Sequence, residues 1–236
     1  MKNIKILHLY SDALDLYGDY KNLDVLVSRI KEGGHNVSVD KPELYDDISF
    51  DQYDMVYIGH GKARNLAAVA EHFVKYEKEV KASVESGTLW LCTGNSRELF
   101  GKSFTTPDGD AKRGIGLFDY KGVETNKVFV CDMKGVPSFA SDSFCYGFAN
   151  RTAYLEGENE YPLFTNVVGF SDSESCDGTE GTLYKNFFGT FSMGPVLARN
   201  PNFLKEILKR LLGDVPKACD FSLEEKAQSL VLAEFK

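Results

Sequence analysis

The sequence contains no long apolar run and no cluster of basic residues. No segment approaches the ~18 consecutive apolar residues that a membrane-spanning helix requires, and the lysines and arginines are scattered. The formal net charge is -8. An acidic protein without a basic patch repels phosphate backbones and anionic lipids. We therefore expect neither a membrane span nor a nucleic-acid partner.

The cysteines are too few and too irregularly spaced to suggest a disulfide framework or a metal site. The five cysteines include no C-x-x-C pair: Cys92, Cys131, Cys145, Cys176 and Cys219. An odd number with this spacing is typical neither of a disulfide framework nor of a zinc site. The N-terminal segment also lacks the apolar core and the small-residue cleavage site of a secretory signal. We therefore expect a cytoplasmic protein with reduced thiols and with no metal or cofactor.

The composition is that of an ordinary globular protein, with 43% hydrophobic and 26% charged residues. A chain of 236 residues is long enough to bury one substantial core. We find no internal repeat, low-complexity tract or interdomain linker. The sequence therefore predicts a single domain over residues 1–236.

The first half alternates strand and helix signals. Apolar segments at residues 4–9, 55–58 and 88–92 are predicted to be buried strands. Residues 22–33 and 65–86 carry apolar side chains at helical spacing. This alternation indicates an α/β fold with three layers, in which helices cover both faces of a doubly wound, mostly parallel sheet.

The second half has a different pattern. Strand-like segments at residues 127–133, 144–148 and 167–170 are short and close together, which favours antiparallel additions to the sheet. Helices are predicted at 203–212 and 223–234. A turn-rich segment at residues 171–181, after the last of these strand-like segments, contains four acidic residues, Asp172, Glu174, Asp177 and Glu180. These lack EF-hand spacing, so we interpret them as a solvated acidic loop.

Two short segments follow predicted strands of the parallel part. They are Gly59-His60-Gly61 and Thr93-Gly94-Asn95. Ligands bind such sheets at the carboxyl ends of the strands. We therefore expect these two segments to border the functional site.

Several motifs follow one another through nearly the whole chain. They are His8-Leu9-Tyr10-Ser11-Asp12, Leu14-Asp15-Leu16-Tyr17, Ile58-Gly59-His60-Gly61, Phe100-Gly101-Lys102, Thr106-Pro107-Asp108-Gly109, Gly114-Ile115-Gly116-Leu117-Phe118-Asp119, Thr125-Asn126-Lys127 and Tyr184-Lys185-Asn186-Phe187-Phe188-Gly189-Thr190-Phe191-Ser192-Met193-Gly194-Pro195. In order and spacing the chain resembles class I glutamine amidotransferases of the cobyric-acid-synthase-like group, and within it the glutaminase subunits of lipid II isoglutaminyl synthases. The resemblance implies a flavodoxin-like, three-layer amidotransferase fold.

The resemblance also implies a chemistry that this chain lacks the side chains to perform. In the family, a cysteine on a sharp strand-to-helix turn, the elbow, attacks the glutamine amide, and a later histidine acts as base. Backbone N–H groups of the glycine loop and the elbow stabilise the oxyanion. The cysteine position corresponds to Gly94 and the histidine position to Met193. Gly94 has no side chain that could act as nucleophile, and the thioether of Met193 cannot act as a base.

The resemblance places substrate binding at Gly59, Gly61, Asn95 and Lys127. Lys127 stands where the family has an arginine, and it supplies a point charge in place of a planar two-pronged donor. We expect residues 93–95 to keep the elbow, because the flanking motifs keep the family's spacing and glycine tolerates strained dihedrals.

Three functions remain open. The first is a degenerate amidotransferase subunit that does not hydrolyse glutamine and that partners or regulates a Mur-ligase-like, ATP-dependent amidating enzyme. The second is an active glutaminase in which Cys92 and His60 form a relocated pair. Cys92 lies two residues before the elbow, so a nucleophile there would place two extra residues before the following helix and turn that helix by about 200°. Cys92 also fits the alternative of a small apolar residue at the buried end of a strand. The third is a binding module for glutamine or a similar small polar ligand.

Overall fold

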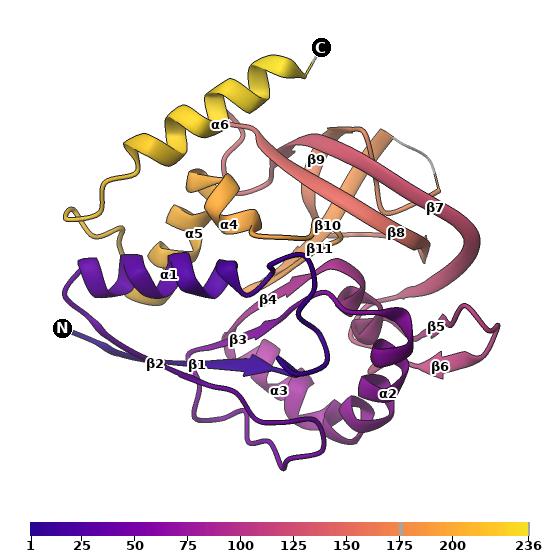
Figure 1. Ribbon diagram of the computed structural model, residues 1–236. Coiled ribbons are helices and arrows are strands. Elements are labelled where there is room, and N and C mark those ends of the chain that lie inside the picture. Colours follow the sequence, from indigo (N-terminus) through magenta and orange to yellow (C-terminus); the bar gives the residue numbers. More distant parts are fainter. Residues whose placement is uncertain (175–176, 236) are drawn as a thin grey trace.

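The computed structural model describes residues 1–174 and 177–235, so Cys176 lies outside the described part. The strands are β1 (Asn3–Leu9), β2 (Asn36–Asp40), β3 (Met55–Ile58), β4 (Leu89–Thr93), β5 (Ser103–Thr105), β6 (Ala111–Arg113), β7 (Tyr120–Pro137), β8 (Cys145–Gly157), β9 (Pro162–Val168), β10 (Asp177–Tyr184) and β11 (Phe187–Thr190). The helices are α1 (Lys21–Glu32), α2 (Ala63–Phe73), α3 (Glu77–Ser86), α4 (Val196–Arg199), α5 (Pro201–Leu212) and α6 (Ser222–Glu234), with 3₁₀ turns η1 (Val74–Tyr76) and η2 (Gly94–Phe100). The strands form one mixed sheet with helices on both faces (Figure 1).

The parallel part of the sheet brings the two expected segments together. Its strands lie in the order β2-β1-β3-β4-β11. In this register Cys92 of β4 lies between Ile58 of β3 and Gly189 of β11. The loops that follow β3, β4 and β11 therefore leave the same edge of the sheet next to one another.

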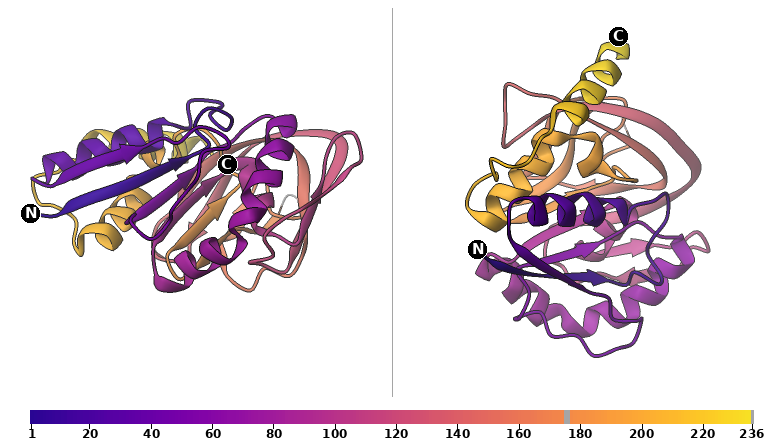
Figure 2. Two further views of the ribbon diagram at one scale, coloured as in Figure 1. Left: turned by 90° about the horizontal axis from the view of Figure 1, so that it is seen from below. Right: turned by 60° about the vertical axis from the view of Figure 1, so that its left-hand side comes forward.

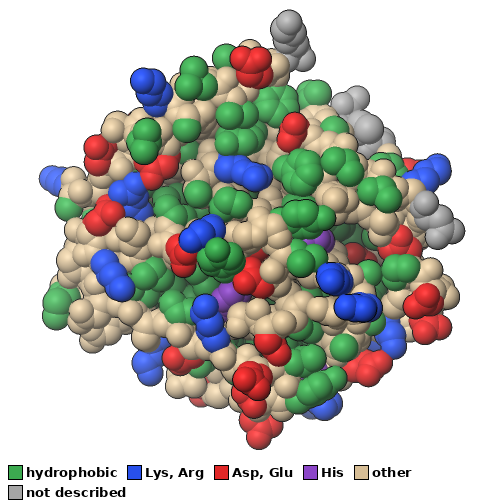
Figure 3. All heavy atoms as spheres, viewed as in Figure 1, with side chains coloured by type: hydrophobic (Ala, Val, Ile, Leu, Met, Phe, Trp, Pro, Cys, Tyr) green, Lys and Arg blue, Asp and Glu red, His purple; other side chains and the backbone are tan. Residues whose placement is uncertain are grey.

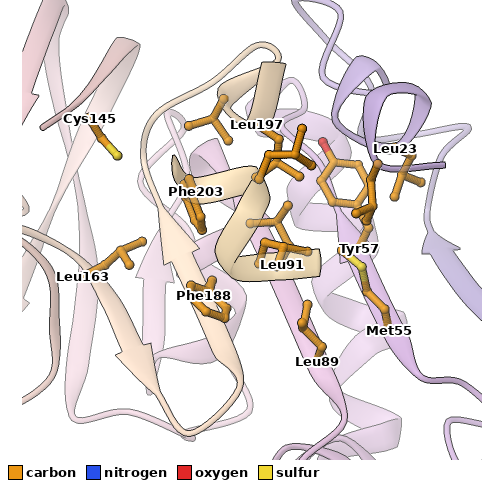
Figure 4. Packing of buried hydrophobic residues seen from close by; sticks show 14 of the residues in the cluster. Leu23, Met55, Tyr57, Leu89, Leu91, Cys145, Leu163, Phe188, Leu197 and Phe203 are labelled. Carbon is orange, nitrogen blue, oxygen red and sulfur yellow. The ribbon is translucent and has the colours of Figure 1, made fainter. Parts of the chain in front are cut away.

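Two apolar cores lie on opposite faces of this part, as the alternation of side chains along a strand requires. On β4, Leu89 and Leu91 pack under α1, α4 and α5, while Trp90 and Cys92 pack over α2 and α3. Figure 4 shows the first core, with Phe203 of α5 close to Phe188 and Leu91 of the strands. All five residues of β4 are buried, which explains its continuous run of apolar residues. The predicted three-layer α/β fold is confirmed.

The mostly antiparallel part is at least as extensive as the parallel one. Beyond β11 the order continues β10-β9-β7-β5-β6, and β8 pairs with β7; within this part β5 is parallel to β7. Strands β7 and β8 are longer than the predicted segments, and Figure 1 shows them as a long curved hairpin. β10 occupies part of the segment that we predicted as a loop. The prediction failed because the glycines and acidic residues of β10 hide its strand pattern.

Two helical features also differ from expectation. The amphipathic segment 65–86 is two helices, α2 and α3, separated by the η1 turn. Helix α6 has no buried residues, and its C-terminal end projects from the rest of the molecule (Figure 2). Acidic and basic side chains alternate over the face in Figure 3. Among the described residues, no helix is long and apolar enough to cross a membrane.

Candidate functional site

The elbow that we predicted is present. β4 ends at Thr93, and Gly94 starts the η2 turn with a φ of +64°. This left-handed conformation is strained for a residue with a Cβ, and glycine adopts it at little cost. The backbone therefore keeps the shape that presents a nucleophile, although residue 94 has no side chain.

The glycine loop after β3 owes its glycines to close packing. A Cβ on Gly59 would lie 2.7 Å from the carbonyl oxygen of Leu14, and a Cβ on Gly61 would lie 2.2 Å from Leu14 Cδ2. Neither position has room for a side chain. The chain around Leu14 thus lies directly against the loop, and the Leu16 N–H donates a 2.9 Å hydrogen bond to the His60 carbonyl.

The His60 side chain fills the space above the elbow. A Cβ built on Gly94 would lie 2.3 Å from His60 Nδ1 and 2.5 Å from His60 Cβ, which is far inside van der Waals contact. His60 is buried, and its ring lies against that of Tyr17, with 5.6 Å between the centroids. The imidazole therefore stands where the side chain of a nucleophile at position 94 would begin.

Three backbone N–H groups of the two segments, those of His60, Gly61 and Asn95, are already hydrogen-bonded within the protein. The Asn95 N–H donates to His60 Nδ1 at 3.1 Å. The Gly61 N–H donates to Asn95 Oδ1 at 3.0 Å, and Asn95 Nδ2 donates to the Gly61 carbonyl at 2.8 Å. The His60 N–H donates to Asp19 Oδ2 at 2.7 Å. An oxyanion at this place would have to displace these internal acceptors.

The charge state of His60 agrees with this arrangement. Burial lowers the pKa of His60 to about 4, so the ring is neutral at physiological pH. A neutral imidazole that accepts at Nδ1 carries its proton on Nε2. His60 therefore acts here as a hydrogen-bond acceptor for the elbow.

Asp19 links the ends of β3 and β4 through its side chain. No feature of the sequence had pointed to this residue. Its Oδ2 accepts the His60 N–H and, at 2.7 Å, the Thr93 hydroxyl. Its Oδ1 is buried and has no hydrogen-bond partner among the described residues. Burial raises the pKa of Asp19 to about 7. Asp19 holds the glycine loop against the elbow.

Met193 lies at the adjacent strand end, as its motif predicts. It follows β11, whose last residue Thr190 is in register with Thr93 of β4. Met193 is buried, and its N–H donates to the Phe148 carbonyl at 2.9 Å. A thioether at this place contributes packing and no proton transfer.

Cys92 points into the core between the sheet and helices α2 and α3. It is fully buried, and its Sγ lies 3.0 Å from the Ser96 hydroxyl. Burial raises the pKa of the Cys92 thiol to about 12, so it is not a thiolate at neutral pH. His60 makes its contacts with Asn95 and Gly94, on the other side of the elbow, and not with Cys92.

A cavity of about 340 Å³ opens beside the elbow. It is lined by Leu16, Tyr17, His60, Gly61, Lys62, Ala63, Leu66, Asn95, Glu98, Phe104, Thr105, Thr106, Pro107, Glu124, Asn150, Arg151, Thr152 and Ala153. The structure thus brings three of the expected residues, His60, Gly61 and Asn95, to one cavity. The structure adds Glu98 and Arg151 to this cavity, and sequence reasoning missed both. Glu98 was taken only as part of the helical segment after the elbow, and Arg151 lies on a strand in a segment without a recognisable motif.

Lys127 is not brought to this cavity. Its side chain is 73% exposed and lies 3.5 Å from Glu174, and it is not among the residues that line the cavity. The position inferred from the family's arginine therefore faces solvent in this chain. Its role in binding stays a prediction.

The predicted solvated acidic loop is wrong for Asp172 and Glu180. Both are buried around the equally buried guanidinium of Arg97. Arg97 Nη2 donates to Asp172 Oδ2 and to the Thr182 hydroxyl, each at 3.1 Å, and Nη1 lies 3.3 Å from Glu180 Oε1. A cation from η2, far away in sequence, is what permits carboxylates to be buried. Glu174 is exposed, as expected.

No group of three or more histidine, cysteine, aspartate or glutamate side chains arranged to hold a metal ion occurs within residues 1–174 and 177–235. The polar groups at the elbow satisfy one another, and Glu98 and Arg151 are the charged groups buried along the cavity wall. The arrangement suits binding of a small polar molecule. It provides no nucleophile and base pair at the elbow.

The comparison with protein families matches residues 5–201 to the CobB/CobQ-like glutamine amidotransferase domain. Two curated relatives carry the name lipid II isoglutaminyl synthase (glutamine-hydrolyzing) subunit GatD. The protein of Staphylococcus aureus is 29% identical, with 98% of this chain and 96% of the relative covered. The protein of Streptococcus pneumoniae is 27% identical, with 89% and 80% covered.

Solved structures of glutamine amidotransferases share the fold. One has a TM-score of 0.55 at 13% identity and covers 87% of this chain and 98% of its own. Another, from Thermotoga maritima, has a TM-score of 0.53 at 12% identity, with 98% and 94% covered. With the family model matching most of its length, this chain belongs to the CobB/CobQ-like glutamine amidotransferase family.

Proposed function

We propose that this protein is a degenerate glutamine amidotransferase subunit that does not hydrolyse glutamine. It acts as partner or regulator of a synthetase of the Mur-ligase-like, ATP-dependent type. The observation that carries the proposal is the position of His60. Its imidazole fills the start of the side-chain space at Gly94 and accepts the Asn95 N–H.

Three further observations support the loss of hydrolysis. Met193 stands at the position of the family's base and cannot exchange a proton at neutral pH. The N–H groups of His60 and Gly61 are bonded to Asp19 and Asn95. Removing a single oxyanion donor costs an enzyme about 10²–10³ in kcat. A site without nucleophile, base and free donors has no remaining route for acyl transfer.

The relatives support the choice of partner. Their name describes one subunit of a synthase, and the chain covers nearly all of the length of the staphylococcal protein. A subunit of that kind works beside a second protein that uses the product. In this chain the fold persists while the space above the elbow is filled by His60, which favours a structural or regulatory contact with such a synthetase.

An active glutaminase based on Cys92 is not favoured. A nucleophilic cysteine needs a low pKa and access to substrate. Cys92 has neither, since burial raises its pKa to about 12 and its side chain has no exposed surface. The cavity of about 340 Å³ beside the elbow favours a different second candidate, a module that binds a small polar ligand without turnover.

The test is ammonia release from glutamine by the purified chain, alone and with a Mur-ligase-like synthetase encoded beside it. We expect no release from the wild type. Gly94→Cys with Met193→His is expected to stay inactive, because His60 still overlaps the new side chain. Adding His60→Gly is expected to produce weak activity, since it frees both the side-chain space and the Asn95 N–H.

The matched control is Cys92→Ala in each background. Because Cys92 lies in the core, it should leave the activity of the triple variant within about a factor of two, apart from effects on stability. Wild-type glutaminase activity that Cys92→Ala abolishes would overturn the proposal and establish the relocated nucleophile. Copurification with the synthetase, or a changed synthetase rate, tests the partnership separately.

A further inference from the structure

We propose that the cavity beside the elbow binds a small ligand that presents a primary ammonium group, and that Glu98 is the counter-ion of that group. Glu98 lines the cavity and is 4% exposed. Within the described part of the chain, its carboxyl group makes no hydrogen bond or ion pair. A buried carboxyl without a partner is costly to a fold, and a ligand donor would satisfy it.

The surroundings of Glu98 hold it rigidly at the cavity wall. It lies in the η2 turn, next to Arg97, whose guanidinium points to the opposite side and is held by Asp172 and Glu180. A Cβ on Gly122 of β7 would lie 2.6 Å from Glu98 Oε2, so the absence of that side chain makes room for the carboxyl group. The carboxyl group is therefore positioned by packing and is open to the cavity alone.

The charges that face Glu98 favour a cation. Glu124 of β7 lines the same cavity, and its Oε2 accepts the Thr152 hydroxyl at 2.8 Å. Arg151 of β8 also lines it, but its Nη atoms donate to the carbonyls of Asp172 and Ser173. His60 is neutral, and Lys62 lies at the exposed rim. Arg97 also lies near Glu98, but its guanidinium is already paired with Asp172 and Glu180. Arg151 Nε has no hydrogen-bond partner among the described residues. The Glu98 carboxyl group, which has no partner there either, with Glu124 beside it, leaves this part of the wall complementary to an ammonium group.

The size and the mouth of the cavity limit the ligand. About 340 Å³ holds a molecule the size of an amino acid or a short diamine. Asn150 Nδ2 donates to the Tyr17 hydroxyl at 2.9 Å across one side of the mouth, and both residues line the cavity. A ligand therefore has to be slender. A primary amine on a short chain meets this condition, while a branched quaternary ammonium does not.

The inference goes beyond the proposed function and stands apart from the loss of hydrolysis. Amine binding needs Glu98 and the cavity, whereas hydrolysis fails because of Gly94, His60 and Met193. Glutaminase activity in the wild type would defeat the proposed function and leave amine binding untouched. Absence of amine binding would defeat only the present inference.

The test is calorimetric titration and thermal unfolding of the full chain with n-butylamine and 1,4-diaminobutane, against n-butanol and n-butyrate. We expect the two amines to bind at least tenfold more tightly than n-butanol. n-Butyrate, which has no ammonium group, is expected to bind more weakly than either amine. Equal affinity for n-butanol and n-butylamine would overturn the proposal.

The pH dependence of binding sharpens the test. Burial, with a smaller contribution from Glu124, raises the pKa of free Glu98 to about 8, and a bound ammonium favours its ionised form. Association of n-butylamine should therefore strengthen about 20-fold between pH 6.5 and 8.5, since the amine stays charged in this range. Arg97 and Arg151 keep their charge here, while Asp19, whose pKa burial raises to about 7, titrates behind the loop and accounts for any remainder that survives Glu98→Gln.

The variant Glu98→Gln keeps the shape of the side chain and removes its charge. We expect it to weaken n-butylamine binding at pH 8.5 more than tenfold and to abolish most of the pH dependence. Glu156→Gln, on the exposed end of β8, changes net charge equally and should leave binding within a factor of two. Unchanged binding by Glu98→Gln would refute the inference. If that variant does not fold, a loss of a few-fold in Glu124→Gln together with the wild-type pH profile decides the question.

Discussion

Two polar clusters pack against opposite sides of the η2 turn, and they begin at neighbouring residues. On one side, Arg97 is enclosed by Asp172, Glu180 and Thr182, so that nearly every donor has an acceptor. On the other side, Glu98 lines the cavity with no hydrogen-bond partner among the described residues. Both side chains are almost completely buried. They differ in whether the fold itself satisfies them.

A buried charged side chain with partners, such as Arg97, stabilises the fold, whereas a buried charged side chain without partners, such as Glu98, is available to bind a ligand. A cation with three partners ties the antiparallel part of the sheet to the elbow, and among the described residues only its Nε lacks an acceptor. On the cavity side, Glu98 has no hydrogen-bond partner in the described part of the chain, whereas His60 and Asn95 bond to each other. We therefore expect substitutions on the first side to affect stability and those on the second to affect binding and titration.

The largest effect should come from removing the cation of the first cluster. Arg97→Met leaves Asp172 and Glu180 buried without a counter-charge, and losing one partner of a buried ion pair costs about 3–5 kcal/mol. Denaturant unfolding measures the loss. Arg113→Met, in an exposed ion pair with Glu77, is the control and should change the unfolding free energy little. Similar losses in both variants would mean that the Arg97 cluster is not structural.

The next effect concerns the elbow on the cavity side. Gly94→Cys forces a Cβ to within 2.3 Å of His60 Nδ1 and strains a backbone with φ of +64°, so we expect a loss of about 3 kcal/mol. In a His60→Gly background the overlap disappears and most of the loss should vanish. A double-mutant cycle on unfolding free energies measures this coupling. Additive effects of the two changes would show that His60 does not obstruct position 94.

A smaller effect is the pH dependence that Glu98 confers on stability. Burial raises the pKa of Glu98 to about 8, so the folded state holds a proton that the unfolded state releases above about pH 4.5. This contribution to stability is complete below pH 4.5 and is lost as the pH rises to 8. Compared between pH 6 and pH 7, the wild type should lose about 1.4 kcal/mol relative to Glu98→Gln. Parallel stability curves for the two proteins would contradict the raised pKa.

The smallest effect is expected at the exterior. Lys127 is largely exposed, and its contact with Glu174 at 3.5 Å is that of a surface ion pair. Lys127→Ala should change neither the melting temperature nor amine binding measurably, and Lys127→Arg should not raise the activity of the variants restored at the elbow. A strong effect of Lys127→Ala on ligand affinity would indicate that the ligand binds nearer to the antiparallel part of the sheet than we propose.

The parallel half was predictable, because its signals are local. The buried strands 4–9, 55–58 and 88–92 and the helix after the first of them carry their periodicity in a few consecutive residues. The elbow at residues 93–95 was predictable as well, from motif order and a glycine. The antiparallel half was harder, since β10 contains two glycines and charged residues, which hide its strand pattern although its partners β9 and β11 are its neighbours in sequence.

The candidate site was predictable only where a motif named a position. Gly94 and Met193 were predicted from their motifs, without a structure, to stand at the family's catalytic positions. The meaning of His60 could not, because a histidine in a glycine loop reads equally as tolerated or functional until its ring is seen against Gly94. The exposed position of Lys127 was also not visible from its motif.

The sequence by itself determined the fold class and the family, and it predicted the absence of a thiol and an imidazole at the family's catalytic positions, because these follow from local pattern and residue identity. Only the tertiary structure decided which buried charges have partners. Arg97 and Glu98 are adjacent in the chain and alike in burial, yet their surroundings come from β7, β8 and β10, which lie far away in sequence. The energy of a buried charge depends on the groups around it in space, and those are set when distant strands pair.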